Sequence, residues 1–346
     1  MLKEMYEQPS TVRETIGTRV TAGAPTQVDG LDFTAAQLQN LHQIYIIGCG
    51  TAMHAGLAAK PMFEHLTHIP TQVDVASEFR YRDPLVDDHT LCIFISQSGE
   101  TADTIAALRL AKAAGAATLA VSNVIGSSIT READYTVYTH AGPEIAVAST
   151  KAYTAQVVLL AVLAIHFAEL LGLGAGVAAD LKADLLELPA LIEETLKCAP
   201  QVKAFADKIH RETDVFFIGR GSDYTTSLEA SLKLKEISYI HSEAYPSGEL
   251  KHGPIALIEK GTTVIGTITD PALVDKSVSN LKEVITRGAK VRASDIDTLI
   301  RVPETHPLLA PAVSILPYQL LSYYIAKQNG LDVDKPRNLA KSVTVE

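Results

Sequence analysis

Cysteine is scarce in this sequence, with three residues among 346. Cys49, Cys92 and Cys198 are too few and too scattered to build a disulfide scaffold or a cysteine-ligated metal knuckle. Cys49 and Cys92 stand in or beside apolar runs, so we expect both to be small buried side chains. The scarcity therefore argues against a disulfide-rich domain and against a metal site of this type.

An excess of basic residues is also missing. The chain has 30 lysines and arginines against 40 aspartates and glutamates, which gives a formal net charge of −10 at pH 7. A nucleic-acid backbone needs a basic protein face, so we expect no nucleic-acid partner. Net charge says nothing about a single cleft, and a local site for one small phosphate is compatible with this composition.

No stretch of the chain is apolar over the ~20 residues that a membrane-spanning helix needs. The longest apolar run, at residues 157–165, ends at His166, and we expect it to be a core or interface helix. The N-terminus shows no signal peptide, since Lys3, Glu4 and Glu7 interrupt any apolar region. The sequence therefore predicts a cytoplasmic protein without membrane contact.

The sequence does contain an internal repeat, with two copies of one pattern of strands and helices. Residues 44–50 are an apolar run that ends in Gly-x-Gly, and residues 215–221 repeat this run 171 residues later. We match residues 77–81 of the first copy with residues 242–245 of the second. The expected elements are helix 52–64, strand 90–95, helix 102–114 and strand 117–121, followed by a loop to 149, in the first copy, and helix 225–240, strand 262–267, helix 276–287 and strand 290–292 in the second.

Apolar strands that alternate with helices imply parallel sheets covered by helices on both faces. The sequence therefore predicts an α/β protein with two doubly wound parallel-sheet domains, each a flavodoxin-like three-layer α/β/α arrangement. An N-terminal helix and a C-terminal tail complete the chain. The expected parts are residues 1–36 (N-terminal helix and linker), 37–172 (first domain), 173–208 (helical connection), 209–331 (second domain) and 332–346 (tail).

A hydroxyl-rich loop, Ser-Gln-Ser-Gly-Glu-Thr at residues 96–101, follows the strand expected at 90–95. In open α/β sheets, ligands bind beyond the carboxyl ends of the strands. Free backbone N–H groups, the start of the next helix and the hydroxyls all favour an anion there, and Gly99 permits a tight turn. Segments 49–52 and 147–150 offer further donors at neighbouring ends. The sequence therefore predicts a phosphate-binding loop.

Two other interpretations compete with a phosphate site. Any one of these hydroxyls alone is more typical of a helix cap, but three such segments in one copy favour a site. A dinucleotide-binding fold needs a third glycine where this chain has Met53, so we reject it, although Asp74 lies about where a ribose-binding acid falls. The second copy has residues 267–270, Thr-Ile-Thr-Asp, where the first has residues 96–99, and we expect its acid to repel phosphate.

Candidate acid–base residues lie in the second copy. Glu229, Lys233 and Glu236 are spaced i, i+4, i+7 and so share one face of a helix. On spacing alone, an exposed Glu–Lys pair is the simpler interpretation. His252 stands in a polar turn bounded by glycine and proline, where it can titrate near neutrality, although a lone loop histidine is usually just solvated.

Seven segments of the chain, in order and spread over nearly its whole length, carry a family resemblance. They are residues 6–9, 76–81, 96–101, 147–151, 232–239, 248–254 and 334–346. These segments resemble the isomerase half of the glucosamine-6-phosphate synthase (glutamine–fructose-6-phosphate aminotransferase) family. The resemblance implies two sugar-isomerase (SIS) domains that convert fructose 6-phosphate to glucosamine 6-phosphate with ammonia, or to glucose 6-phosphate without it, in amino-sugar biosynthesis toward UDP-N-acetylglucosamine.

The resemblance also implies a role for each candidate residue. Glu236 would move a proton between C1 and C2, and Lys233 and Glu229 would support the intermediate. His252 of a neighbouring subunit would open the sugar ring, and Lys341 would form an imine with the open ketose. A carboxylate suits proton transfer between adjacent carbons, and a neutral lysine attacks carbonyl carbon. Substrate contacts would come from Ser96, Gln97, Ser98 and Thr101 for the phosphate and from Thr51, Ala52, Val147, Ser149 and Ala340 for the sugar.

The resemblance implies no metal and no cofactor, and it implies a homodimer or larger homo-oligomer with a shared active site. One departure is Ala52, which stands where the family commonly has serine and so lacks one hydroxyl contact. The complete enzyme begins with a glutaminase domain whose nucleophile is an N-terminal cysteine, whereas this chain has no cysteine before Cys49. We therefore expect no glutamine hydrolysis, and a glutaminase domain as partner only if the chain is a fragment.

Two further functions stay open from the sequence. One is a stand-alone SIS glucosamine-6-phosphate deaminase or phosphosugar isomerase, because residues do not reveal the direction of a reaction. The other is a sugar-phosphate-sensing module without catalysis. It ranks last, since Glu236, His252 and Lys341 are all present and no helix-turn-helix precedes the domains.

Overall fold

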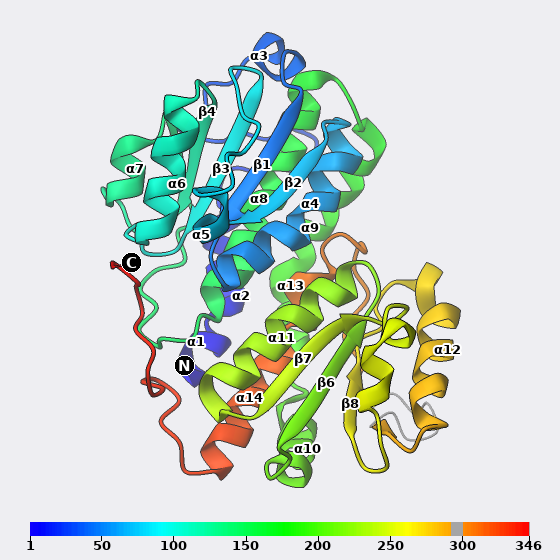
Figure 1. The fold of residues 1–346 in the computed structure, drawn as a ribbon. Coiled ribbons are helices and arrows are strands. Elements are labelled where there is room, and N and C mark those ends of the chain that lie inside the picture. Colours follow the sequence, from blue (N-terminus) through cyan, green and yellow to red (C-terminus); the bar gives the residue numbers. More distant parts are fainter. Residues whose placement is uncertain (292–299, 346) are drawn as a thin grey trace. The chain divides into compact units, whose positions relative to one another are not determined.

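The chain folds into two units, each built around its own parallel sheet (Figure 1). The computed structural model describes residues 1–291 and 300–345. Both sheets are parallel and flanked by helices, so the expected α/β architecture with two parallel-sheet domains is confirmed. The N-terminal unit comprises Glu7–Glu144, Lys151–Pro189 and Ala340–Glu346, and the C-terminal unit comprises Met1–Tyr6, Ile145–Thr150 and Ala190–Leu339.

The centre of the N-terminal unit is a five-stranded parallel sheet. Its elements are α2 (Gln8–Ile16), α3 (Ala35–Gln39), β1 (Gln43–Gly48), α4 (Thr51–Thr67), β2 (Thr71–Val75), α5 (Ala76–Phe79), β3 (Thr90–Ser96), α6 (Ala102–Ala113), β4 (Ala117–Ser122), α7 (Ser128–Glu132), β5 (Tyr135–Tyr138) and α8 (Lys151–Leu171). The strand order is β2-β1-β3-β4-β5. Every residue of β3 is buried, as expected of a parallel strand covered on both faces.

Helices cover both faces of this sheet. Tyr45 of β1 and Phe94 of β3 pack with residues of α5 and α6 on one face. Ile46 points to the other face and packs against Gly56 of α4. A Cβ on Gly56 would lie 2.8 Å from the Ile46 side chain. Helix α8 packs on α4 and also contacts α2 and α3. Because β1 leads into α4 and β3 into α6, the carboxyl ends of these two adjacent strands meet two helix N-termini.

The C-terminal unit has a four-stranded parallel sheet in the order β7-β6-β8-β9. Its elements are α1 (Leu2–Tyr6), α10 (Ala199–Ile209), β6 (Asp214–Gly219), α11 (Ser222–Ser238), β7 (His241–Pro246), η1 (Leu250–His252), η2 (Pro254–Leu257), β8 (Thr263–Gly266), η3 (Pro271–Leu273), α12 (Val274–Ile285), β9 (Lys290–Val291), α13 (Ala310–Ser314) and α14 (Leu316–Gln328), and α9 (Ala175–Leu196) contributes to both units. Phe216 and Ile218 of β6 pack with Leu281 of α12. Phe217 meets Tyr318 of α14 on the other face, with ring centroids 5.8 Å apart.

The internal repeat expected from the sequence is present in the backbone. Helices α4 and α11 have 17 residues each, and both follow a glycine with nearly the same angles: φ 54° and ψ −125° at Gly50, φ 54° and ψ −127° at Gly221. Both helices end at a residue in the left-handed conformation, His68 and Tyr239. The positive φ explains the second glycine of each Gly-x-Gly, since other residues rarely adopt it.

Strand pairing corrects one of the expected matches between the copies. Ile47 of β1 pairs with Asp74 of β2, and the equivalent Ile218 of β6 pairs with Tyr245 of β7. Strand β7 is therefore the counterpart of β2, and its residues do not correspond to residues 77–81, which follow β2. A short Ser-Glu similarity suggested the wrong match, because the sequence alone did not fix the strand register.

The loop after β8 is shifted by one residue from the expected match. Ile47 of β1 pairs with Phe94 of β3, and the equivalent Ile218 of β6 pairs with Gly266 of β8. Asp270 therefore stands where the first copy has Ser98, and not where it has Gly99. One extra residue between β7 and β8 causes this shift.

Two short elements lie in the segment that was expected to be a loop up to residue 149. Helix α7 and strand β5 follow β4, and β5 adds the fifth strand to the sheet. The expectation of a loop is wrong at these residues, because elements of five and four residues are too short to show a period in the sequence. Residue 292, the expected end of the last strand, lies outside the described residues.

Helix α8 contains the longest apolar run of the sequence. Within residues 1–291 and 300–345 it is the one helix that is long and apolar enough to cross a membrane by length and composition alone. The structure buries 78% of its 18-residue apolar window, as is typical of the core helix of a soluble protein. The expectation of a core helix is confirmed.

The cysteines provide a test of this fold. Burial raises the pKa of Cys92 in β3 to about 12 and that of Cys198 to about 11, whereas Cys49 is only partly buried. Because the thiolate is the reactive form, we predict that Ellman's reagent modifies at most Cys49 in the native protein and all three thiols in denaturant. Rapid modification of more than one thiol in the native protein would contradict the burial described above.

Candidate active site

The loop at residues 96–101 joins the end of β3 to the start of α6. Ser96 Oγ accepts a hydrogen bond from the N–H of Gly99 at 3.0 Å and lies 3.2 Å from Thr101 Oγ1. Ser98 Oγ accepts the backbone N–H two residues further on, at 3.2 Å. The loop therefore gathers hydroxyls and the first N–H groups of a helix at a carboxyl end of the sheet, which is the donor set that an anion needs.

Gly99 fixes the shape of this loop. Its φ is +68°, and a Cβ at this position would lie 2.0 Å from Ser127 Oγ. Ile129, at the start of α7, would also lie within 3.1 Å. Both the backbone conformation and the neighbouring side chains therefore require glycine.

The C-terminal tail lies against the same loop. Ser342 Oγ is 3.0 Å from Ser98 Oγ, and the N–H of Ala102 donates to the carbonyl of Val343 at 3.1 Å. Ala102 is the first residue of α6, so its N–H has no hydrogen-bond partner within the helix. These contacts bring Lys341, the residue before Ser342, to the candidate anion site of the N-terminal unit.

Lys341 is paired with a buried carboxylate that the sequence did not indicate. Its Nζ lies 2.5 Å from Glu144 Oε2, and the Glu144 side chain is fully buried whereas that of Lys341 is 24% exposed. The other oxygen of Glu144 accepts the N–H of Ala152, in the first turn of α8, at 3.1 Å. The partners are 197 residues apart, so no local pattern could reveal the pair. Ser342 lies in the tail segment, residues 334–346, on which the family resemblance rests, but the resemblance implied no role for it.

A buried ion cluster of Glu229, Lys233 and Glu236 lies on α11 in the C-terminal unit. Lys233 Nζ is 3.3 Å from Glu229 Oε1 and 2.5 Å from Glu236 Oε2. The side chains of Lys233 and Glu229 are fully buried, and that of Glu236 is 21% exposed. An exposed surface pair, the simpler interpretation of the spacing, is therefore wrong. We call this group the Lys233 cluster.

The charges of the Lys233 cluster support one another. Burial disfavours the charged form of Lys233, but the carboxylates of Glu229 and Glu236 outweigh it and raise the pKa of the ammonium above its ordinary value. One ammonium between two carboxylates leaves one negative charge in excess. The partly exposed Glu236 is the member that can present this charge to a ligand.

The other expected site residues of the N-terminal unit lie on α4, in the 96–101 loop and in the tail. Thr51 and Ala52 form the first turn of α4 and are half-buried. The carbonyl of Gln97 accepts the N–H of Asn123 at 3.2 Å, which ties the loop to the end of β4. Ala340 is exposed in the tail, next to Lys341.

Three expected site residues belong to the C-terminal unit along with the Lys233 cluster. The N–H of Val147 donates to the carbonyl of Asp334 at 3.0 Å. Ser149 is half-buried, and His252 ends η1 with an exposed side chain. The structure thus brings the 96–101 loop and Lys341 together in one unit, and the members of the Lys233 cluster together in the other.

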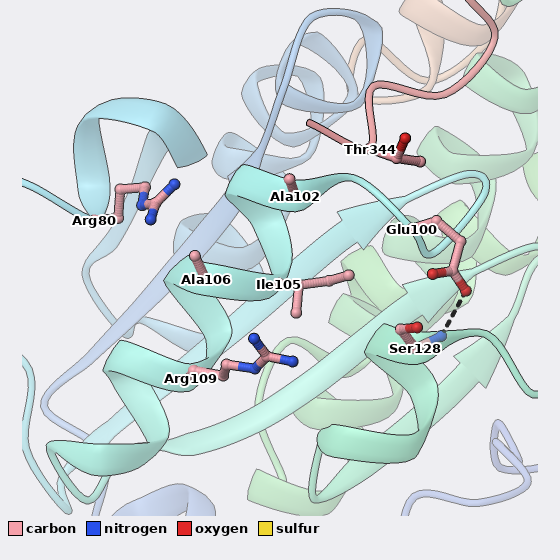
Figure 2. Close-up of a pocket in the computed structure, with 8 residues that line it drawn as sticks. All are labelled: Arg80, Glu100, Ala102, Ile105, Ala106, Arg109, Ser128 and Thr344. Carbon is pink, nitrogen blue, oxygen red and sulfur yellow. Dashed lines mark hydrogen bonds between the residues drawn. The ribbon is translucent and has the colours of Figure 1, made fainter. Parts of the chain in front are cut away.

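A pocket of about 370 Å³ opens beside α6 in the N-terminal unit (Figure 2). Its two arginines are paired, Arg80 with Asp103 at 3.1 Å and Arg109 with Glu132 at 2.7 Å. The pocket lining includes none of the expected site residues, so we do not assign it to the candidate site. The lining residues are Arg80, Glu100, Ala102, Ile105, Ala106, Arg109, Ser128 and Thr344.

The donor set of the candidate site contains no metal-binding cluster. Across the described parts of the chain, no three His, Cys, Asp or Glu side chains are grouped so that they could hold a metal ion. The N-terminal unit provides hydroxyls, backbone N–H groups and the Lys341–Glu144 pair, and the C-terminal unit provides the Lys233 cluster. These groups suit anion binding and proton transfer.

The burial of Lys233 predicts a large effect on stability. Replacing Lys233 with alanine leaves two carboxylates beside each other without a counter-charge, and breaking a buried ion pair in this way costs about 3–5 kcal/mol. We therefore expect Lys233→Ala to lower the thermal unfolding midpoint of the C-terminal unit by about 10 °C. Lys235→Ala, at an exposed position of the same helix, is the matched control and should change the midpoint little. Equal effects of the two changes would contradict the buried cluster.

Comparison with known proteins places both units in one family. The model of the SIS domain family matches residues 37–166 and 208–326. The glutamine–fructose-6-phosphate aminotransferases (isomerizing) of Clostridium tetani and Thermus thermophilus are 53% and 50% identical to this chain over its whole length. The chain spans 59% of the length of each of these relatives.

Solved structures give the same result. The C-terminal domain of glucosamine-fructose-6-phosphate aminotransferase from Francisella tularensis is 40% identical, with a TM-score of 0.90, and the match covers 97% of this chain and 98% of that one. Glucosamine-6-phosphate deaminase from Thermotoga maritima shares the fold, at 23% identity and a TM-score of 0.79, over 99% of this chain and 98% of that one. This chain therefore belongs to the SIS domain family, and its two SIS domains correspond to the C-terminal isomerase part of the glutamine–fructose-6-phosphate aminotransferases.

Proposed function

We propose that this chain binds fructose 6-phosphate and converts it to glucosamine 6-phosphate when ammonia is present, or to glucose 6-phosphate when it is not. The observation that carries the proposal is the unequal exposure of the Lys233 cluster, in which only Glu236 is accessible. A carboxylate that is held by a buried ammonium and open on its other side can take a proton from one carbon and return it to the next. The names of the relatives support the choice of sugar.

The phosphate of the substrate binds to the 96–101 loop in this proposal. Ser96, Gln97, Ser98 and Thr101 donate to it, and the N-terminus of α6 adds its dipole. The hydroxyls of Ser96 and Ser98 already hold the loop in shape through its own N–H groups. Thr51, Ala52, Val147, Ser149 and Ala340 line the sugar.

Lys341 forms the imine with the open-chain ketose. Its neutral amine attacks C2, a C–N bond forms, and the carbonyl oxygen leaves as water. The ammonium of Lys341 must lose a proton first, and Glu144 Oε2, 2.5 Å from Nζ, accepts it. Glu144 is held in turn by the N–H of Ala152, so the acceptor has a fixed position.

Glu236 then carries out the isomerisation. Before this step, ammonia attacks C2 and displaces the Lys341 amine, so that the sugar carries its own imine at C2; without ammonia, water hydrolyses the Lys341 imine and restores the C2 carbonyl. Glu236 takes a proton from C1 and returns it to C2, while Lys233, which is paired with Glu229 and Glu236, keeps the Glu236 carboxylate in place. His252 opens the sugar ring, and its exposed position on η1 suits a residue that serves the site of a neighbouring subunit. The active protein is then a homodimer or a larger homo-oligomer, and it works in the cytoplasm.

The source of ammonia lies outside this sequence in our proposal. The relatives are named for glutamine as well as for the sugar, and this chain spans 59% of their length. A glutaminase domain, attached or separate, supplies the nitrogen, and the chain itself does not hydrolyse glutamine. The direct test is to incubate the chain with fructose 6-phosphate, with and without ammonium, and to identify the sugars formed. A sensing module would form neither product.

Replacing Glu236 with glutamine should separate binding from turnover. Glutamine keeps the shape of the side chain but cannot accept the C1 proton, so we expect the turnover number to fall by about 10²–10⁴-fold while the affinity for fructose 6-phosphate stays nearly the same. Glu259→Gln, at an exposed site of the same unit, is the matched control. Turnover at the wild-type rate in Glu236→Gln would remove this residue from its role.

Replacing Ser98 with alanine should act on the phosphate alone. Hydrogen bonds to charged groups contribute about 1.5–3 kcal/mol, so we expect roughly 10–100-fold weaker binding of fructose 6-phosphate in equilibrium titrations. Ser128→Ala, in α7 outside the loop, controls for general damage to this unit. If the variant lost affinity equally for fructose and for fructose 6-phosphate, the loop would not be the phosphate site.

A further inference from the structure

The second SIS copy has an acid where the first has a small apolar residue. Asp223, in the first turn of α11, is the equivalent of Ala52 in the first turn of α4. The N–H of Ala52 donates to the carbonyl of Cys49 at 3.2 Å, and the N–H of Asp223 donates to that of Arg220 at 3.0 Å. The two turns therefore share one backbone conformation and differ in the side chain that points from it.

The carboxylate of Asp223 takes up the donors of the loop after β8. It is 1% exposed, its Oδ2 accepts the backbone N–H of Thr269 at 2.9 Å, and its Oδ1 accepts the hydroxyl of the same residue. The backbone N–H of Asp270 also lowers the pKa of this carboxyl and so favours its charged form. By strand pairing, Thr269 and Asp270 stand where the first copy has Gln97 and Ser98, two residues of the proposed phosphate site.

The charges around this carboxylate leave no place for a second anion. Burial raises the pKa of Asp223, the two hydrogen bonds from Thr269 oppose that rise, and the neighbouring charge of Asp270 adds to it. Asp270 itself accepts the N–H of Ala272 at 2.9 Å. A phosphate that entered this loop would meet two carboxylates and donors that are already engaged.

The geometry points to Asp223 as an internal ligand, whose carboxylate occupies the anion position of the second SIS copy so that each chain binds one phosphosugar, at the 96–101 loop. Both copies then use the same chemistry, in which N–H and hydroxyl groups beyond a strand bind a negative charge. Ala52 leaves room for the charge of a ligand, and Asp223 supplies the charge itself. The inference rests on the proposed function, since the two positions are comparable only if the first one binds phosphate.

The wild-type chain tests this inference without any substitution. Calorimetric titration with fructose 6-phosphate should give one site per chain, and crystals soaked in tungstate, a heavy phosphate analogue, should show the anion at residues 96–101. A second site, or tungstate at residues 267–270, would overturn the inference and leave the proposed function intact. An absence of binding would remove the proposed function, and the inference with it.

A variant tests whether the carboxylate acts as a bound anion. Asp223→Ala should lower the thermal unfolding midpoint by about 5 °C, because buried donors lose their acceptor. Sodium formate, which supplies a free carboxylate, should restore a large part of this loss relative to sodium chloride at the same ionic strength. Asp223→Asn, which keeps the shape and one acceptor oxygen, and the wild type should not respond to formate in this way. The same response in Asp223→Ala and in the wild type would overturn the inference.

Discussion

The ion pairs of Lys233 are the interaction on which the proposed chemistry of this molecule depends. An ammonium with no exposed surface is tolerable only because carboxylates lie at 3.3 Å and 2.5 Å from it. In return, the lysine fixes the rotamer of Glu236 and leaves one edge of that carboxylate open. Helix α11 thus holds a charged group in a defined position, where a flexible surface glutamate would spend most of its time elsewhere.

The repeated backbone allows two equivalent structures to serve different purposes. Helices α4 and α11 begin after glycines with nearly identical angles and end in the same left-handed cap. The differences lie in side chains: the first copy offers hydroxyls and Ala52 at its sheet edge, and the second offers Asp223 and the Lys233 cluster. In the proposed function, binding and chemistry are divided between the copies, although α4 and α11 begin and end in the same backbone conformations.

The sequence was sufficient for those features that repeat locally. Alternating apolar strands and helices predicted both sheets, and the spacing of Glu229, Lys233 and Glu236 placed them on one face. Periodicity could not reveal α7 and β5, which are too short. Spacing alone also favoured an exposed Glu–Lys pair, because burial is a property of the tertiary structure.

Long-range pairs were beyond the sequence for a different reason. Glu144 and Lys341 are 197 residues apart, and nothing in either segment indicates the other. The one-residue shift between the loops after β3 and β8 came from an added residue between two strands, which only the pairing of Phe94 and Gly266 with the central strands disclosed.

Gly99 fixes the shape of its own loop and also constrains which sequence changes the neighbouring loop tolerates. Its missing side chain is matched to Ser127 on another loop, and that loop in turn holds Glu100 through the N–H of Ser128 at 2.8 Å. A substitution in one of these loops would therefore disturb the contacts of the other. The two loops are therefore expected to change together during evolution or to stay as they are.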